Sequence, residues 1–357
     1  GSSYTYDANG NRVAWSTNGS ATVPARGFNR SEFRTIAVPT ERWNAAAKGF
    51  FEYIDNHEAF FEITYAGTNA VSELEPFPLN STDVFDPDGY VPLQTAQYVP
   101  RPGGGFDRIV LNNPTVPAYT LANSVDQDGD GLIDLAYFSR RMSEIGNRGN
   151  KVDRNTFNGV FGLQGKLFDE KWDDDAFYTY GQTSEAQTSS GQVNVLNFRN
   201  ALQAIPDVND IDGDGNLSEA ICADAIARAQ GCVPANIYGA GALSPEAVAY
   251  ISAPGSYNTF IELNVIGLTM TGEVMDLPAG PVATAFGGEY RSERSRAEFD
   301  VLQQQGLNAG NAILPTRGKY FVGEAFAEVN VPILKDVFMA ERLDLRGAYR
   351  YSDYSTV

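Results

Sequence analysis

The sequence predicts an all-β protein, specifically an antiparallel transmembrane β-barrel segment with short periplasmic turns and long extracellular loops. Three observations predict it. In segments such as "LDLRGAYRYSDY" (343–354), apolar and polar residues alternate, which gives a strand one apolar and one charged face. Several such segments exceed a dozen residues, whereas most strands of soluble proteins have about five or six. Short and long connections alternate between them, as in outer-membrane barrels. A soluble sandwich would instead turn the apolar face inward, and this alternative stays open on sequence alone.

Composition agrees with this fold class and excludes some functions. The 357 residues are 43% hydrophobic, 12% aromatic and only 20% charged, with 35 glycines, a composition that favours strands and turns. No apolar run approaches the roughly 18 residues of a membrane-spanning helix. The net charge of −19 argues against a nucleic-acid partner, which requires a basic surface.

The strand-like segments fall into four pairs. In the third pair, the apolar positions change phase at Ile266, which predicts a β-bulge there. Long polar connections are expected at about 71–152, 190–257 and 299–317, with short helices in 217–231 and 244–253. Loops of this length are unusual in compact soluble domains. The predicted pairs are 42–54 with 59–67, 154–168 with 176–188, 258–277 with 282–299, and 319–333 with 343–354.

An ordered set of segments resembles the barrel of TonB-dependent outer-membrane receptors. The likeness covers most of residues 30–357 and is weakest in the long loops. It implies a barrel of about 22 strands plugged by an N-terminal domain. The chain lacks a recognisable plug, TonB box or aromatic-ended last strand, so the expectation is the middle part of such a barrel, with plug and C-terminal strands absent. The segments are "AFFEITYAG", "GCVPANIYGAG", "LPAGPVATAFGGEYRSE", "YFVGEAFAEVNVPIL" and "LDLRGAYRYSDYST".

The resemblance implies active uptake of a scarce nutrient, such as a siderophore or saccharide, across the outer membrane of a Gram-negative bacterium. The implied partners are outer-membrane lipid, a small-molecule or oligosaccharide ligand, and the TonB energy-transducing complex, reached through the missing plug and TonB box. Two alternatives remain. One is a soluble or surface-attached, calcium-stabilised β-rich binding or adhesion protein. The other is a secreted glycan-active enzyme.

Two acidic loops, "DQDGDGLID" and "DIDGDGNLS", match the start of a D-x-D-x-D-G calcium loop. Both lack the bidentate glutamate that ends an EF-hand loop, and the alternative is a solvated Asp-Gly turn. We predict structural Ca²⁺ in extracellular loops, with these oxygen ligands: Asp126, Asp128, Asp130, the Leu132 carbonyl and Asp134 in the first loop, and Asp210, Asp212, Asp214, the Asn216 carbonyl and Ser218 in the second.

The other side chains with chemical potential are few. Cys222 and Cys232 predict a disulfide that closes a small loop, with two free thiols as the alternative. The one histidine, His57, is expected at the surface of the short turn "DNHE". No nucleophile or phosphate-binding motif is present, so the sequence predicts that the protein is not an enzyme. Trp43, Tyr65, Tyr349 and Tyr351 are candidates for the aromatic girdles of a membrane barrel.

Overall fold

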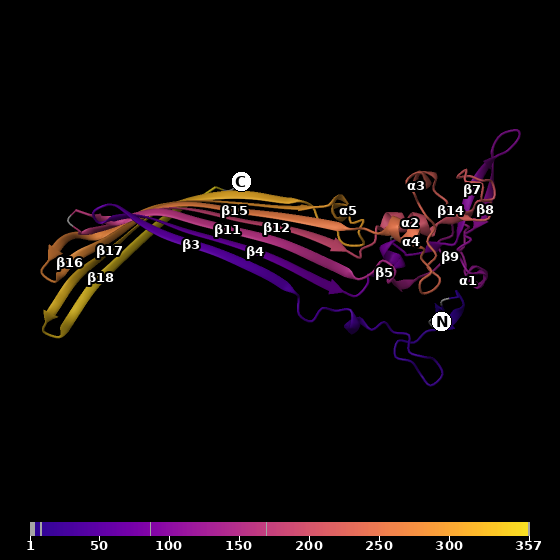
Figure 1. Ribbon diagram of the computed structural model, residues 1–357, viewed down its shortest axis with the longest axis horizontal. Coiled ribbons are helices and arrows are strands. Elements are labelled where there is room, and N and C mark those ends of the chain that lie inside the picture. The colour runs from indigo at the N-terminus through magenta and orange to yellow at the C-terminus, as the bar shows by residue number, and fades with distance from the viewer. Residues whose placement is uncertain (1–3, 8, 86, 169, 356–357) are drawn as a thin grey trace.

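A computed structural model describes residues 4–7, 9–85, 87–168 and 170–355 of the chain (Figure 1). Its main feature is one antiparallel sheet of eight long strands in the order β18-β17-β16-β15-β12-β11-β4-β3. Every strand pairs with the long strand next to it in the chain, so the sheet is an up-and-down meander. The all-β, antiparallel class is therefore confirmed. The strands are β3 (Thr40–Ile54), β4 (His57–Leu74), β11 (Arg148–Leu167), β12 (Trp172–Ser190), β15 (Gly255–Leu277), β16 (Gly280–Phe299), β17 (Thr316–Val337) and β18 (Ala340–Tyr354).

Short and long connections leave the sheet at opposite ends (Figure 1). Three of the short turns contain two residues each, Asp55–Asn56, Pro278–Ala279 and Phe338–Met339. At the other end, residues 75–147, 191–254 and 300–315 form the long connections. Each strand is longer than the alternating pattern indicated, because it continues beyond the expected segment at one or both ends. The sheet is open within the described chain, since β3 and β18 each pair on one side only.

The strand register places residues of one kind on each face. Directly paired residues of antiparallel strands point to the same side, and successive rows alternate. One row across all eight strands consists of Phe51, Ala59, Leu163, Ala176, Leu268, Gly288, Ala325 and Tyr351. The next row consists of Glu52, Glu58, Gln164, Asp175, Thr269, Gly287, Phe326 and Arg350. We call the side of the first row the apolar face and that of the second row the polar face.

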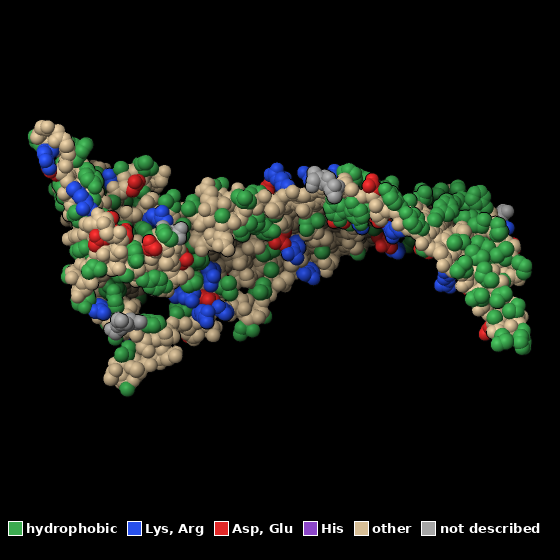
Figure 2. All heavy atoms as spheres, turned by 180° about the vertical axis from the view of Figure 1, so that it is seen from behind, with side chains coloured by type: hydrophobic (Ala, Val, Ile, Leu, Met, Phe, Trp, Pro, Cys, Tyr) green, Lys and Arg blue, Asp and Glu red, His purple; other side chains and the backbone are tan. Residues whose placement is uncertain are grey.

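The large side chains of the apolar face are exposed. Leu345 is 64% exposed, Tyr349 73% and Tyr351 59%. Among the buried hydrophobic residues of the described chain, only Val282 and Val322 belong to the eight long strands. Hydrophobic side chains gather over the turn end of the sheet in the view of Figure 2. No helix or second sheet of the described chain packs as a layer over the long strands.

The predicted bulge at Ile266 is wrong. Strand β15 keeps its register with both neighbours through this position, and its shift occurs later, between Glu273 and Met275. The phase of the apolar residues changes because Leu263 and Val265 lie on the polar face, opposite Glu293 and Arg291. An apolar side chain is tolerated on either face of a wide sheet, so a change in the pattern does not require a backbone irregularity.

Glycines within the strands make room for aromatic rings on the polar face. Phe60 pairs directly with Gly162, and its ring occupies the space where a Cβ of residue 162 would lie. The ring thus covers backbone that glycine leaves bare, an arrangement that supports strand pairing and register. Replacement of Gly162 by a larger residue would displace the Phe60 ring.

The long connections fold together into a cap at one end of the sheet, and the cap contains the hydrophobic core (Figure 1). Phe198, Leu79, Met142 and Ile251 are fully buried there. No helix in the described residues is long and apolar enough to span a membrane. The expected helices in 217–231 and 244–253 are short, and α1, α2 and α5 are additional. The helices are α1 (Ala118–Asn123), α2 (Val195–Leu202), α3 (Ala225–Ala229), α4 (Pro245–Ile251) and α5 (Val301–Gln304), with 3-10 turns η1 (Arg30–Glu32) and η2 (Ser81–Asp83).

Short strands complete the cap and the N-terminal segment. Among the described residues they form five two-stranded sheets, β1-β2, β5-β10, β6-β9, β7-β8 and β13-β14. Their bounds are β1 (Tyr4–Tyr6), β2 (Arg12–Ala14), β5 (Pro78–Asn80), β6 (Val91–Pro92), β7 (Gln94–Pro100), β8 (Phe106–Asn112), β9 (Asp134–Leu135), β10 (Ser139–Arg141), β13 (Ala204–Pro206) and β14 (Ala220–Cys222).

Candidate functional site

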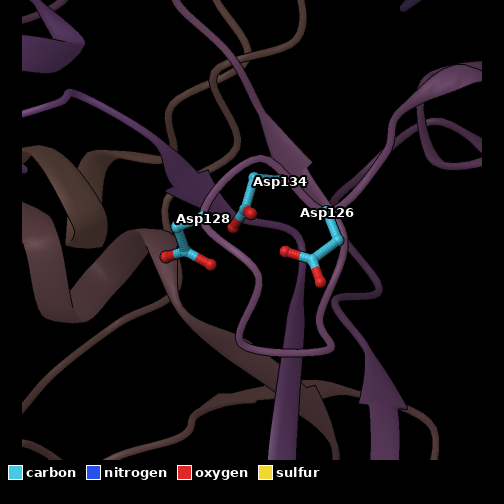
Figure 3. A group of neighbouring side chains, drawn as sticks. All are labelled: Asp126, Asp128 and Asp134. Atoms are coloured by element: carbon cyan, nitrogen blue, oxygen red, sulfur yellow. The ribbon is translucent and has the colours of Figure 1, made fainter.

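The first acidic loop, residues 126–134, lies in the cap and ends on the short strand β9. Its carboxylates from Asp126, Asp128 and Asp134 offer oxygen atoms within 4.8 Å of one another, and the three side chains point toward a common centre (Figure 3). Oxygen ligands that share one Ca²⁺ at about 2.4 Å lie at most about 4.8 Å apart. These three residues therefore have a spacing that suits one hard cation.

Backbone hydrogen bonds hold this loop in a tight conformation. Asp126 accepts hydrogen bonds from the backbone N–H groups of Gly129 (2.7 Å) and Gly131 (2.9 Å). Both glycines have positive φ, which favours glycine at these positions. These hydrogen bonds lower the pKa of Asp126. The local fold thus keeps one carboxylate ionised and turned inward.

Asp134 is the buried member of the group, with 3% of its surface exposed. The N–H of Gln127 donates a hydrogen bond of 3.2 Å to its carboxylate. Burial raises the pKa of Asp134, and the neighbouring aspartates raise it further. A bound cation would oppose both effects, because it stabilises the ionised form.

The structure brings together only part of the predicted first ligand set. The Asp130 carboxylate accepts a hydrogen bond from the Leu132 N–H at 2.7 Å and is not part of the group of three. The carbonyl oxygen of Asp130 accepts a hydrogen bond from Arg108 at 3.0 Å. Asp126, Asp128 and Asp134 thus stand as the candidate ligands with geometric support.

In the second loop, the structure places Asp210, Asp212 and Asp214 together, and all three are exposed. The side-chain oxygen of Asn216 accepts hydrogen bonds from the N–H and the hydroxyl of Ser218, so these two predicted ligands contact each other. A second group, Asp207, Asp212 and Glu219, overlaps with the first. Sequence reasoning missed Asp207 and Glu219, because both lie outside the motif.

The sulfur atoms of Cys222 and Cys232 are joined at 2.06 Å, as the sequence predicts. The bond connects β14 to the residues that follow α3. Asp224 caps this helix by accepting a hydrogen bond from the Ala227 N–H at 2.7 Å. The disulfide therefore closes a compact loop next to the second acidic loop.

Glu75 connects the cap to the sheet. It follows β4, is only 3% exposed, and accepts two hydrogen bonds of 3.0 Å from Arg34. Arg148 and Arg141 lie 3.5 and 3.8 Å from the same carboxylate. The hydrogen bonds from Arg34 are the main cause that lowers the pKa of Glu75 to about 2. Three arginines from separate parts of the chain thus converge on one buried charge.

The polar face of the sheet carries ion pairs between neighbouring strands. Arg350 on β18 donates a hydrogen bond of 2.9 Å to Glu324 on β17, and Ser352 donates one of 2.6 Å to the same carboxylate. Arg154 and Glu185 form a similar pair between β11 and β12. Arg350 and Ser352 thus hold the Glu324 carboxylate in place.

The position and the exposure of His57 differ from those expected from the sequence. It begins β4 instead of lying in a turn, and its side chain is 14% exposed, with Nε2 3.5 Å from Asp174 Oδ1. It pairs directly with Gly165, whose missing side chain leaves room for the imidazole ring. The two-residue turn before His57 is shorter than expected, so the histidine is drawn into the sheet.

The girdle candidates lie on the apolar face. The ring centroids of Trp43 and Tyr65 are 4.8 Å apart, and Trp43 is 57% exposed.

Comparisons of this chain with protein-family models, curated proteins and solved structures found no match.

Proposed function

We propose that the chain is part of the wall and extracellular cap of a TonB-dependent outer-membrane transporter that takes up a scarce nutrient such as a siderophore or saccharide. The observation that carries this proposal is the contrast between adjacent rows of the sheet. The row through Tyr351 is apolar across eight strands, and the next row, through Arg350, contains three carboxylates and an arginine.

Exposure of the apolar side favours a lipid environment over water. Monomeric soluble proteins rarely expose contiguous apolar patches larger than a few hundred Å². Here Phe161, Tyr178 and Ile266 pair directly across the adjacent strands β11, β12 and β15, and their exposed fractions on this face are 48%, 42% and 57%. In a bilayer such side chains contact hydrocarbon, whereas in a soluble sandwich they would pack against a second sheet.

The opposite side suits an aqueous interior. Its residues include the ion pairs Arg350–Glu324 and Arg154–Glu185. Charged side chains within a membrane barrel face the lumen, where water solvates them. A barrel also leaves no unpaired strand edge in lipid, so in this proposal β3 and β18 pair with further strands of the same wall.

The cap supplies a surface for ligand capture outside the membrane. Its own hydrophobic core, around Phe198 and Leu79, makes it a folded unit instead of a set of free loops. In this proposal Ca²⁺ at Asp126, Asp128 and Asp134 stiffens the first acidic loop, since extracellular calcium fills even sites with dissociation constants of about 10⁻⁴–10⁻³ M. Energy would come from the TonB complex of the Gram-negative envelope, and no catalytic step is assigned to the chain.

The same cap favours a second candidate, a calcium-stabilised binding or adhesion protein. A structured cap with a disulfide and acidic loops could bind a partner without any transport. The two candidates differ in what the sheet contacts.

Tryptophan quenching by brominated lipids tests the contact. The full chain is refolded in detergent and transferred to vesicles as two single-tryptophan variants: one keeps Trp43 on the apolar face, and the matched control keeps Trp15 outside the sheet. Brominated acyl chains should quench Trp43 strongly and Trp15 little. The calcium-stabilised binding or adhesion protein would be favoured if Trp43 and Trp15 were quenched equally weakly and the chain were monomeric and stable without detergent.

Transport is tested separately in the native host. Accumulation of labelled iron chelates and oligosaccharides is compared between cells with and without the intact gene, in the presence and absence of a protonophore. Energy-dependent uptake that requires the gene is expected. Unchanged uptake of the whole panel would remove the support for a transport role.

A further inference from the structure

The second acidic loop, residues 207–219, is closed at its base by the pairing of β13 with β14. Asp207 follows β13 directly and Glu219 precedes β14, and the N–H of Asp207 donates a hydrogen bond of 3.0 Å to the Glu219 carbonyl oxygen. The disulfide from Cys222 anchors the same strand pair to the segment after α3. Two carboxylates are therefore held side by side at the neck of this loop, close to the disulfide.

Asp207 is completely buried, at 0% exposure. One of its carboxylate oxygens accepts a hydrogen bond from the Ile211 N–H at 2.7 Å. The other oxygen, Oδ2, has no hydrogen-bond partner among the described residues, and the same is true of the buried Oε1 of Glu219. A buried carboxylate oxygen without a partner is strongly disfavoured, so this pair requires a positive group or a proton.

The surrounding side chains supply more oxygen but no positive charge. Carboxylate oxygens of Asp207, Asp212 and Glu219 lie within 4.8 Å of one another, the span that ligands of a single Ca²⁺ can cover. The sequence of the loop from 207 to 219 contains no lysine, arginine or histidine. No ion pair to Asp207 or Glu219 occurs within the described chain. Oxygen ligands alone favour calcium over zinc or copper.

We propose that Asp207, Asp212 and Glu219 bind one Ca²⁺ at the neck of this loop. The ligand set differs from the contiguous series Asp210, Asp212 and Asp214 that the motif predicts. Those three residues are all exposed, and exposed carboxylates are satisfied by water, so they need no ion. The site is independent of the proposed membrane role, because it rests on the cap alone.

The site explains why an acidic loop follows β13 at this position. Ca²⁺ between Asp207 and Glu219 would tie both ends of the loop together, next to the strand pair and the disulfide. Occupancy then couples the conformation of residues 207–219 to the concentration of calcium around the protein. The exposed tip of the loop would change least, since its own hydrogen bonds, such as that from the Gly215 N–H to Asp210 (2.8 Å), do not involve the ion.

Calorimetric titration with CaCl₂ tests the site. The full refolded chain carries Asp128→Asn and Asp134→Asn in every sample, so that the first acidic loop does not contribute. Asp207→Asn and Glu219→Gln should each weaken calcium binding at least about tenfold, the lower end of the effect of disturbing even outer-shell partners. Asp210→Asn and the exposed control Glu246→Gln on α4 should change the affinity less than about threefold.

Three results would overturn the proposal. The first is no calcium uptake up to about 10 mM, above the range of weak extracellular sites, which would leave a shared proton as the partner of the two buried oxygens. The second is unchanged affinity in Asp207→Asn and Glu219→Gln. The third is a loss of calcium affinity in Asp210→Asn alone, which would assign the ion to Asp210, Asp212 and Asp214. Circular dichroism checks folding, and Glu219→Gln decides the question if Asp207→Asn does not fold.

Discussion

The effect of Leu345→Lys on stability distinguishes a sheet that faces lipid from one that faces water. Leu345 lies on the apolar face of β18 and is 64% exposed. In water, Leu345→Lys would change the free energy of unfolding by no more than about 0.5 kcal/mol, as is usual for exposed positions. In a bilayer the same change places a charge against hydrocarbon, so the environment decides the magnitude.

The position of Leu345 sets the expected cost. It lies five residues beyond Ala340, where β18 leaves the short turn. At about 3.3 Å per residue and a tilt of about 45°, it lies about 12 Å above the turn. The apolar band of such barrels is about 25 Å tall, so Leu345 is near its middle, where lysine costs about 2–4 kcal/mol.

The assay is urea unfolding from phospholipid vesicles, followed by tryptophan fluorescence, with the free energy taken from the linear denaturant dependence. Ile226→Lys on cap helix α3 is the matched control, because Ile226 is similarly exposed, at 69%. It should stay within about 0.5 kcal/mol of the wild type. Equal effects of the two substitutions in vesicles would refute the assignment of the apolar face to lipid.

Three further predictions concern the cap. Glu75→Gln should lower the free energy of unfolding by about 1.5–3 kcal/mol, the range for hydrogen bonds to charged groups, as measured by chemical unfolding. Arg34→Lys keeps the charge but not the bidentate contact, so it should lower the free energy of unfolding by less. The pKa of Glu75 in the folded protein, about 2, is below the ordinary value of 4.5. The contribution of Glu75 to the free energy of unfolding is therefore full above about pH 4.5 and disappears as the pH falls toward 2. If the difference in stability between the wild type and Glu75→Gln did not change over this pH window, the assigned role of the Glu75 carboxylate would be contradicted. Replacing both Cys222 and Cys232 by serine should cost about 3 kcal/mol for a loop of this length, and an unchanged thermal midpoint of the cap under reducing conditions would argue against the disulfide. Phe198→Ala should cost about 3–5 kcal/mol through the cavity it leaves and should expose the cap to limited proteolysis while the sheet stays protected; equal protection of the cap would contradict its core.

The sheet was largely predictable from the sequence, because its pattern is local. Alternation in 343–354 assigns Leu345 and Arg346 to opposite faces, and the structure agrees. The pattern failed at Leu263 and Val265, where apolar residues lie on the polar face. Period-two patterning identifies a strand face only when both faces differ in polarity, and in the middle of β15 they do not.

The cap core could not be predicted from alternation. Its buried residues come from two separate connections, 75–147 and 191–254, and no local pattern records such contacts. Helix α2 of this core is the exception, because its sequence carries a helical pattern. Asn194 caps the helix, and Val195, Phe198 and Leu202 follow at helical spacing. The same reason explains why Asp207 and Glu219 were missed, since the pairing of β13 with β14 brings them together from outside the motif.

A dimer in water would also remove the apolar face from solvent, if two copies of the sheet stacked through this face. It would bury Leu345 and Tyr351, and Leu345→Lys would destabilise it too. The two arrangements differ in their dependence on concentration, because the stability of a dimer rises with protomer concentration, whereas that of a chain embedded in lipid does not. Unfolding midpoints of the wild type that stay constant over a hundredfold range of protein, at a fixed lipid-to-protein ratio, would therefore assign the apolar face to lipid. A midpoint that rises with protein in the absence of lipid would assign it to a second copy of the chain.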